Sequence, residues 1–152
     1  MSGCRKEAGR GHGEISAMKP RDATRPRIVC FGEVLWDLYP DARHLGGAPA
    51  NVAVHARQLG AETHLLSRVG HDALGDTALA TLAARGVQLD ATTRDRTRPT
   101  GRVVVTFTAG QPSYEIRADA AWDHIELPGP SRWRDFDAFC FGSLAQRTRA
   151  QH

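Results

Sequence analysis

Residues 45–54 read Leu45-Gly46-Gly47-Ala48-Pro49-Ala50-Asn51-Val52-Ala53-Val54, and this stretch decides the fold that the sequence predicts. Pro49 suits the first turn of a helix, where its missing N–H would have no partner anyway. The helix is predicted to run to Leu59 and to stop at Gly60, because glycine readily adopts the left-handed conformation of a helix end. Its apolar face is expected to consist of Val52, Ala56 and Leu59.

Strands are predicted on both sides of this helix. Residues 27–33 are an apolar run that ends in Gly-Glu, and residues 34–39 continue as extended chain. Residues 63–69 form a second apolar run. A second helix is predicted over residues 72–85, with one apolar row made of Leu74, Ala78 and Leu82. Strand, helix, strand and helix at this spacing predict βαβ units and a parallel sheet.

The later part of the chain departs from this alternation. Residues 100–108 and 113–118 flank Ala-Gly-Gln-Pro, which predicts a β-hairpin around a Gly/Pro turn. One face of the hairpin would carry Val103, Val105 and Phe107. Residues 135–142 are predicted to form a further buried strand.

Composition and charge indicate one globular domain with a basic extension. The chain has 152 residues, 41% of them hydrophobic and 24% charged, which fits one domain. Residues 1–26 show no periodicity and are predicted to be a disordered basic extension, and residues 148–152 a polar tail. Residues 1–27 hold seven basic and three acidic residues, which gives them a net charge of +4. The whole chain carries +3, so residues 28–152 have a net charge of −1. The basic balance is therefore poor evidence for a nucleic-acid partner.

Several other classes of protein are not indicated. No apolar run approaches the roughly 20 residues that cross a bilayer, and no secretory signal is visible, so we expect a cytoplasmic chain without a membrane partner. The three cysteines are not paired in spacing, which excludes a disulfide framework and a zinc finger. No metal site is predicted from the scattered histidines, and the P-loop, His-Glu-x-x-His and Gly-x-Ser-x-Gly motifs are absent.

The glycine pair Gly46-Gly47 is the first candidate for a binding site. Two glycines let a ligand approach the backbone where a Cβ would collide, and the helix start that follows offers unpaired N–H groups. Asn51 can donate and accept hydrogen bonds. These features suit a polyhydroxylated or anionic ligand. A plain tight turn, with Asn51 near the helix cap, is the alternative.

Asp37 is the second candidate, because it is a carboxylate within the apolar run Val-Leu-Trp-Asp-Leu-Tyr. Burying a carboxylate is costly unless something bonds to it, and two adjacent sugar hydroxyls would suit its two oxygens. The alternative is an edge-strand carboxylate that faces water. Glu33 has a weaker case, since a residue at the end of a strand can simply be solvated.

These motifs together resemble a known family. Residues 46–53 with Leu59-Gly60 and Val69-Gly70-x-Asp72-x-x-Gly75 resemble the first signature of the PfkB/ribokinase carbohydrate kinases. The opening Phe31-Gly32-Glu33-Val34-Leu35-Trp36-Asp37 is similar to the first strand of the fructokinase branch. The hairpin from Thr100-Gly101 is similar to the lid of that family and residues 141–145 to a later core strand, so that the resemblance covers about residues 27–147.

The resemblance implies an α/β protein with a ribokinase-like three-layer α/β/α sheet and a small β-hairpin lid, whose elements would lie at about residues 34–39 and 100–118. The family transfers the γ-phosphoryl group of ATP to a sugar hydroxyl with Mg²⁺. Carried over to this sequence, the sugar would be bound by Asp37, Gly46, Gly47 and Asn51. Phe107 and Tyr114 would be apolar walls of a lid that excludes water, and the lid could form a homodimer contact.

The resemblance also implies what this chain lacks. The acidic Mg²⁺ site, the Gly-Ala-Gly-Asp anion hole with its catalytic Asp and the adenine pocket belong to the family's second half. We therefore expect the sugar-binding half of a fructokinase-like kinase, truncated after about the first half, without catalytic, cofactor-binding or metal residues and inactive alone. The alternatives are a kinase for 2-keto-3-deoxygluconate, ribose or a nucleoside, and a non-catalytic truncated sugar-binding fragment.

Overall fold

The computed structural model describes residues 24–147. Most of the predicted basic extension, residues 1–23, and the predicted polar tail, residues 148–152, lie outside the described residues.

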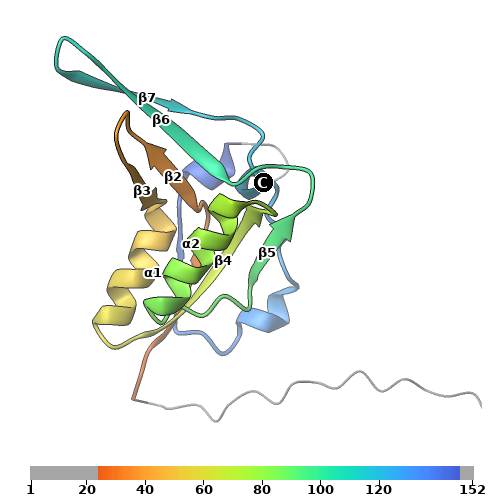
Figure 1. Cartoon of the computed structure of the whole chain (residues 1–152). Coiled ribbons are helices and arrows are strands. Elements are labelled where there is room, and N and C mark those ends of the chain that lie inside the picture. The colour runs from red at the N-terminus through yellow and green to blue at the C-terminus, as the bar shows by residue number, and fades with distance from the viewer. Residues whose placement is uncertain (1–23, 148–152) are drawn as a thin grey trace, which may run out of the picture.

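A parallel sheet of four strands forms the centre of the molecule (Figure 1). Its order is β5 (Thr92–Asp95), β4 (Glu62–Gly70), β1 (Arg27–Phe31) and β8 (Ala138–Phe141). β1 pairs in parallel with β4 on one side and with β8 on the other. Parallel neighbours need crossover connections, and α1 (Ala48–Gln58) lies in the crossover from β1 to β4. The predicted βαβ arrangement is confirmed.

Both helices lie against the same face of this sheet, α1 beside α2 (Ala73–Ala84). Successive strand residues point to opposite faces, so that Cys30, Leu65 and Val69 face the helices. The predicted apolar row of α2 is confirmed, because Ala78 and Leu82 are buried and Leu74 packs against them.

The predicted apolar face of α1 is wrong. Leu59 is 89% exposed and Val52 is 39% exposed. The residues that α1 buries are instead Pro49, Ala50, Ala53 and Val54. Small alanine side chains let the helix lie close to the sheet, where dense packing matters more than the size of each apolar side chain. The loop that enters the helix at Gly47 then sets which side of the helix faces inward.

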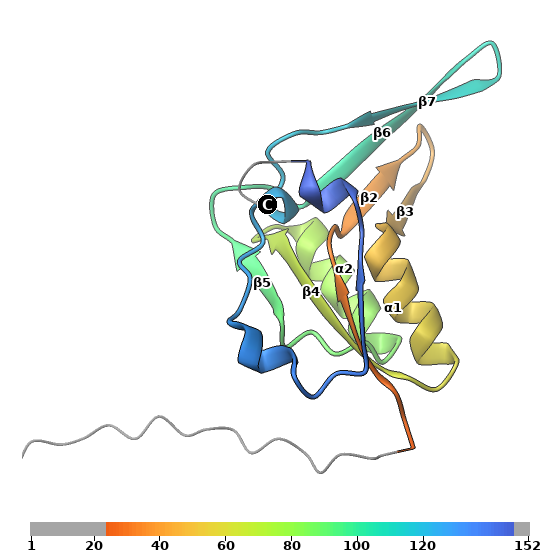
Figure 2. The ribbon, with the colours of Figure 1, turned by 180° about the vertical axis from the view of Figure 1, so that it is seen from behind.

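The opposite face of the sheet is covered by short turns (Figure 2). Three 3₁₀ turns, at Ala121–His124, Pro130–Trp133 and Leu144–Gln146, belong to this layer. Trp122 is fully buried there among Val29, Phe31 and Leu66. The α/β class is confirmed, and between residues 24 and 147 the helical layer of the expected three-layer arrangement covers one face only.

The predicted buried strand near residues 135–142 is present as β8, but it is not buried. Phe139 is 48% exposed and Phe141 is 59% exposed. The reason is its place in the sheet, because β8 is an edge strand whose one partner in the described part of the chain is β1.

A second sheet projects from the carboxyl ends of the central strands. Its order is β3 (Arg43–Gly46), β2 (Leu35–Leu38), β6 (Gly101–Thr108) and β7 (Gln111–Ile116). The predicted hairpin is present, with a tighter turn than expected. Ala109 at φ 51° and Gly110 at φ 77° make the turn, and Pro112 already pairs with Phe107 in the ladder. We call this sheet the lid.

The base of the lid leaves no room for a side chain at Gly101. A Cβ there would lie 2.6 Å from Trp122 Cδ1 and 2.9 Å from the carbonyl oxygen of Val34. Trp122 belongs to the core and Val34 precedes β2, so that the first residue of β6 is in contact with both the core and the lid.

We expect Gly101→Ala to lower the free energy of unfolding by about 1–3 kcal/mol, because a buried tryptophan and a backbone carbonyl must both move. Urea unfolding followed by tryptophan fluorescence measures the change. Gly129→Ala is the matched control, since a Cβ at that position has no atom within 4 Å. Equal stability of the two variants would contradict the close contact at the lid base.

Candidate functional site

The glycine pair lies over the end of the central strand. Gly47 is the N-cap of α1 and has φ 110°, and a Cβ on it would collide with the carbonyl oxygen of Glu33. A Cβ on Gly46 would lie 2.6 Å from Asp37 Oδ2. Only glycine fits at Gly47, for reasons of space and of backbone conformation, whereas a Cβ at Gly46 would have to displace the Asp37 carboxylate. The structure therefore brings Asp37, Gly46 and Gly47 together.

Asp37 lies in the middle of β2, opposite His44 of β3, and is half-buried. Burial raises the pKa of its carboxyl group, and the nearby His44 lowers it by a smaller amount. No hydrogen bond to the Asp37 side chain comes from residues 24–147. Both carboxylate oxygens are therefore able to accept hydrogen bonds from a ligand beside Gly46.

Asn51 lies in the first turn of α1, where its backbone N–H donates to the Gly47 carbonyl at 2.9 Å. Its side chain is exposed, and Gly47 rather than Asn51 caps the helix. Asn51 is therefore in the first turn of the helix, near its cap as the sequence indicates, and its exposed side-chain amide can bond to a ligand.

Phe107 and Tyr114 lie on the lid face that also carries Asp37. Asp37 pairs with Val103, and Val105 pairs with Tyr114, so that residues two apart on β6 share this face. Both aromatic side chains are exposed. Phe107 is four residues beyond Val103, which is about 13 Å along a strand. The structure thus puts Phe107 toward the tip of the lid and away from the glycine pair, and Tyr114 on the outer strand midway along the hairpin.

Sequence reasoning underrated Glu33. The residue is only 3% exposed, and its Oε1 accepts the backbone N–H of Ala48 at 2.9 Å. The first N–H groups of a helix have no partner within the helix, and a carboxylate there also complements the helix dipole. This helix cap could not be predicted from local residue spacing, because Glu33 is 15 residues away from the helix end that it caps.

Sequence reasoning also missed the role of Asp72 at the lid base. Asp72 caps α2 by accepting the Gly75 N–H at 2.8 Å, and it accepts the backbone N–H of Thr100 at 2.9 Å and its hydroxyl at 2.7 Å. Burial tends to raise the pKa of Asp72, but these bonds outweigh it and the pKa is lowered. The motif Gly70-x-Asp72-x-x-Gly75 therefore ties α2 to the start of β6.

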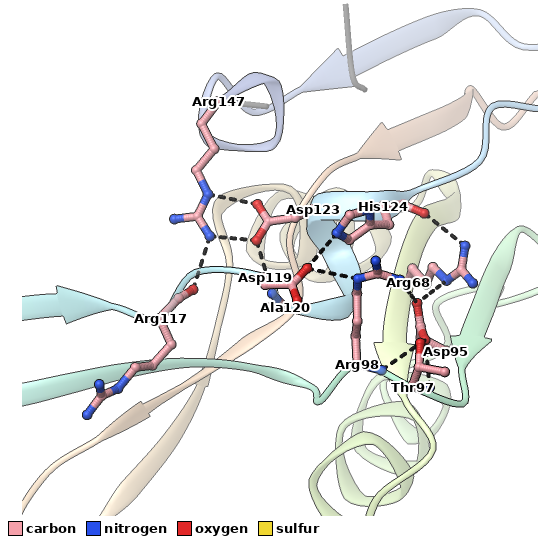
Figure 3. A network of polar contacts seen from close by, with 10 residues as sticks. All are labelled: Arg68, Asp95, Thr97, Arg98, Arg117, Asp119, Ala120, Asp123, His124 and Arg147. Carbon is pink, nitrogen blue, oxygen red and sulfur yellow. Dashed lines mark hydrogen bonds and ion pairs between the residues drawn. The ribbon is translucent and has the colours of Figure 1, made fainter. Parts of the chain in front are cut away.

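The other strand of the hairpin is held by the network in Figure 3. Asp119, at φ 54°, accepts from Arg98 Nε and from His124 Nε2, both at 2.8 Å. Asp123 binds Arg147 through two hydrogen bonds of 2.7 Å. Arg147 also donates to the carbonyl oxygen of Arg117, directly after β7. Both strands of the hairpin are thus attached to the core at their bases.

Asp95, at the end of β5, is the buried centre of the same network. Its Oδ1 accepts from the Thr97 N–H and hydroxyl at 2.8 Å and from the Arg98 N–H at 2.9 Å. Its Oδ2 forms an ion pair with Arg68 Nε at 3.1 Å. Burial alone would raise the pKa of Asp95, but these partners lower it far below its usual range.

We expect Asp95→Asn to lower the free energy of unfolding at pH 7 by about 1–3 kcal/mol, since buried donors lose a charged acceptor. A lowered folded-state pKa stabilises the protein above the unfolded pKa of about 3.9, and this contribution is lost as the pH falls. The difference between wild type and variant should therefore shrink as the pH falls from about 5 to about 2. Urea unfolding at several pH values measures it, with exposed Asp41→Asn as control. A constant difference would contradict the assigned role.

A groove of about 470 Å³ lies at the base of the lid. It is lined by Leu38, Pro99, Thr100, Arg102, Val104, Arg117, Ala118 and Ala120. Leu38, Arg102 and Val104 alternate with Asp37 and Val103 along their strands, so the groove lies on the lid face opposite to Asp37. This groove and the glycine pair are separate features.

Residues 24–147 bring no three His, Cys, Asp or Glu side chains together in a way that could hold a metal ion. Within the same part of the chain, neither helix has the length and apolar character needed to span a bilayer.

The fold and this geometry define an α/β domain with a lid that rises beside a glycine-rich helix start. A family model described as "pfkB family carbohydrate kinase" matches residues 25–123. The chain belongs to the pfkB family of carbohydrate kinases.

Individual relatives agree with this assignment. A protein of Pyrococcus horikoshii named as a sugar kinase is 34% identical over 66% of this chain and 36% of its own length. The fructokinase of Solanum tuberosum is 33% identical over 78% of this chain and 42% of its own length. A crystal structure titled as the Pyrococcus horikoshii sugar kinase in complex with ATP is 29% identical, with a TM-score of 0.74 over 82% of this chain and 45% of that chain. This chain thus spans less than half the length of these relatives.

Proposed function

We propose that this chain is the sugar-binding part of a fructokinase-like kinase that phosphorylates a sugar hydroxyl with ATP. The observation that carries the proposal is the contact between the glycine pair and Asp37, where a Cβ at Gly46 would lie 2.6 Å from a carboxylate oxygen. A sugar can lie flat against backbone of this kind while its hydroxyls donate to Asp37. The names of the relatives, which include a fructokinase, support fructose as the first sugar to test.

Each proposed contact has a separate task. Asp37 accepts hydrogen bonds from two neighbouring hydroxyls, and Gly46 and Gly47 allow the close approach. Asn51, at the exposed start of α1, bonds a further hydroxyl. Phe107 and Tyr114 act only when the lid moves or when a second copy brings its own lid close, because Phe107 lies toward the lid tip and Tyr114 on the outer strand of the hairpin. Their exposure also supports a homodimer through the lid.

The proposed reaction uses ATP and Mg²⁺. A relative of similar fold is titled as a complex with ATP. The donor set between residues 24 and 147 does not fit Mg²⁺, because no three suitable side chains meet. The proposal therefore assigns the ATP site, the Mg²⁺ site and the catalytic base to a further part of the kinase domain. Because ATP is the phosphoryl donor, a cytoplasmic location is part of the same proposal.

We expect Asp37→Ala to weaken the binding of fructose to the purified chain by about 100-fold or more. Two hydrogen bonds to a charged group are lost, at about 1.5–3 kcal/mol each. Isothermal titration calorimetry with millimolar fructose measures the affinity. Asp41→Ala is the matched control, because Asp41 is an exposed carboxylate in the β2–β3 connection, four residues after Asp37. Equal binding by wild type and Asp37→Ala would reject the site, and no binding by the wild type would reject the proposed function.

We also expect the fructose affinity to fall as the pH is lowered through the raised pKa of Asp37. Protonation removes an acceptor, so that well below this pKa the affinity should fall about tenfold for each pH unit. Titrations between pH 7 and pH 4 measure the effect. Asp37→Asn should bind fructose weakly, with little dependence on pH. If this variant keeps the wild-type pH profile, the titration belongs to another group.

A further inference from the structure

Glu33 holds the loop of the glycine pair through two different contacts. Its backbone carbonyl lies directly beneath Gly47, where it excludes any Cβ. Its side-chain Oε1 accepts the N–H of Ala48 at 2.9 Å. One residue at the carboxyl end of β1 therefore contacts both residues that lead from the glycine pair into α1.

The second carboxylate oxygen of Glu33 lies near the end of β8. This oxygen, Oε2, is buried, and no donor from the described chain reaches it. A Cβ at Gly142 would lie 3.0 Å from this oxygen and 3.1 Å from Pro49 Cγ. The carboxylate is thus enclosed between the start of α1 and the end of β8.

A buried carboxylate with only one oxygen satisfied is unfavourable for stability alone. A buried polar atom without a hydrogen-bond partner is expected where a functional site needs a particular geometry. The helix has no side-chain cap of its own at Gly47, so the carboxylate substitutes for one from a distant strand.

We propose that Glu33 is a positioning residue of the sugar site. It fixes the distance of the Gly46–Gly47 backbone from the end of β1 and keeps this backbone beside Asp37. It contacts the loop rather than the sugar. The proposal rests on the proposed function, because the loop matters only if a sugar lies against it. A shift of the loop would separate the backbone from Asp37 and lower sugar affinity, while the central sheet stays folded.

The test compares Glu33→Leu with Glu33→Gln. Leucine removes the acceptor of the Ala48 N–H, and glutamine keeps one amide oxygen in its place. Glu33→Leu should bind fructose about tenfold more weakly, and Glu33→Gln should recover most of the affinity. Leu82→Ala is the control for lost stability alone, since Leu82 is buried on α2 and takes no part in the hydrogen bond between Glu33 and Ala48. It should leave the affinity unchanged at temperatures where the protein is folded.

Amide hydrogen exchange without sugar gives a second readout. The Ala48 N–H should exchange about tenfold faster in Glu33→Leu and stay protected in Glu33→Gln and in Leu82→Ala. If Glu33→Leu does not fold, Gly142→Ala replaces it, because its added Cβ would displace Oε2 and should also increase Ala48 exchange.

The two readouts separate the proposals. If wild type does not bind fructose, the proposed function is rejected, while Ala48 exchange that follows the prediction still supports the contact between Glu33 and the loop. Wild-type fructose affinity in Glu33→Leu, or Ala48 exchange in Glu33→Leu or its replacement Gly142→Ala that equals the wild-type rate, would overturn the positioning role.

Discussion

The contact between Gly47 and the carbonyl oxygen of Glu33 is the constraint on which the rest of the structure depends. It brings the start of α1 directly over the end of β1, at a distance that no residue with a Cβ allows. The position of this loop sets which side of α1 faces the sheet, and the packed alanines of the helix follow from it. It also places the glycine pair that leads into the helix beside Asp37.

The lid depends on a second set of contacts at its base. Asp72 binds the start of β6 through Thr100, and Arg147 binds the chain after β7 through Asp123 and the Arg117 carbonyl. Both strands are attached close to the core, whereas the tip with its exposed aromatic residues has few contacts of its own. Segments with few buried contacts have low local stability, so motion of the lid is expected at its tip rather than at its base.

Much of the fold could be predicted from local patterns. Both helices, the strands β1, β4 and β8, the hairpin and the row of Ala78 and Leu82 follow from periodicity and turn residues, because these depend on neighbours in sequence. The short strands β3 and β5 were not predicted, because four polar or mixed residues carry no periodic signal. The face of α1 and the exposure of β8 could not be predicted. Both depend on which elements cover each surface. The local sequence around an apolar residue such as Phe141 does not distinguish an edge strand from a central one.

The sequence by itself determined the family motifs, the glycine pair and the candidate carboxylate at Asp37, because glycine and buried-charge requirements are properties of single residues. Only the tertiary structure decided that Asp37 meets Gly46, that Glu33 caps a helix 15 residues away, and that Phe107 lies far from both. These relations join separate strands and a helix. They depend on register and on the packing of the loop over β1, which no local pattern of residues records.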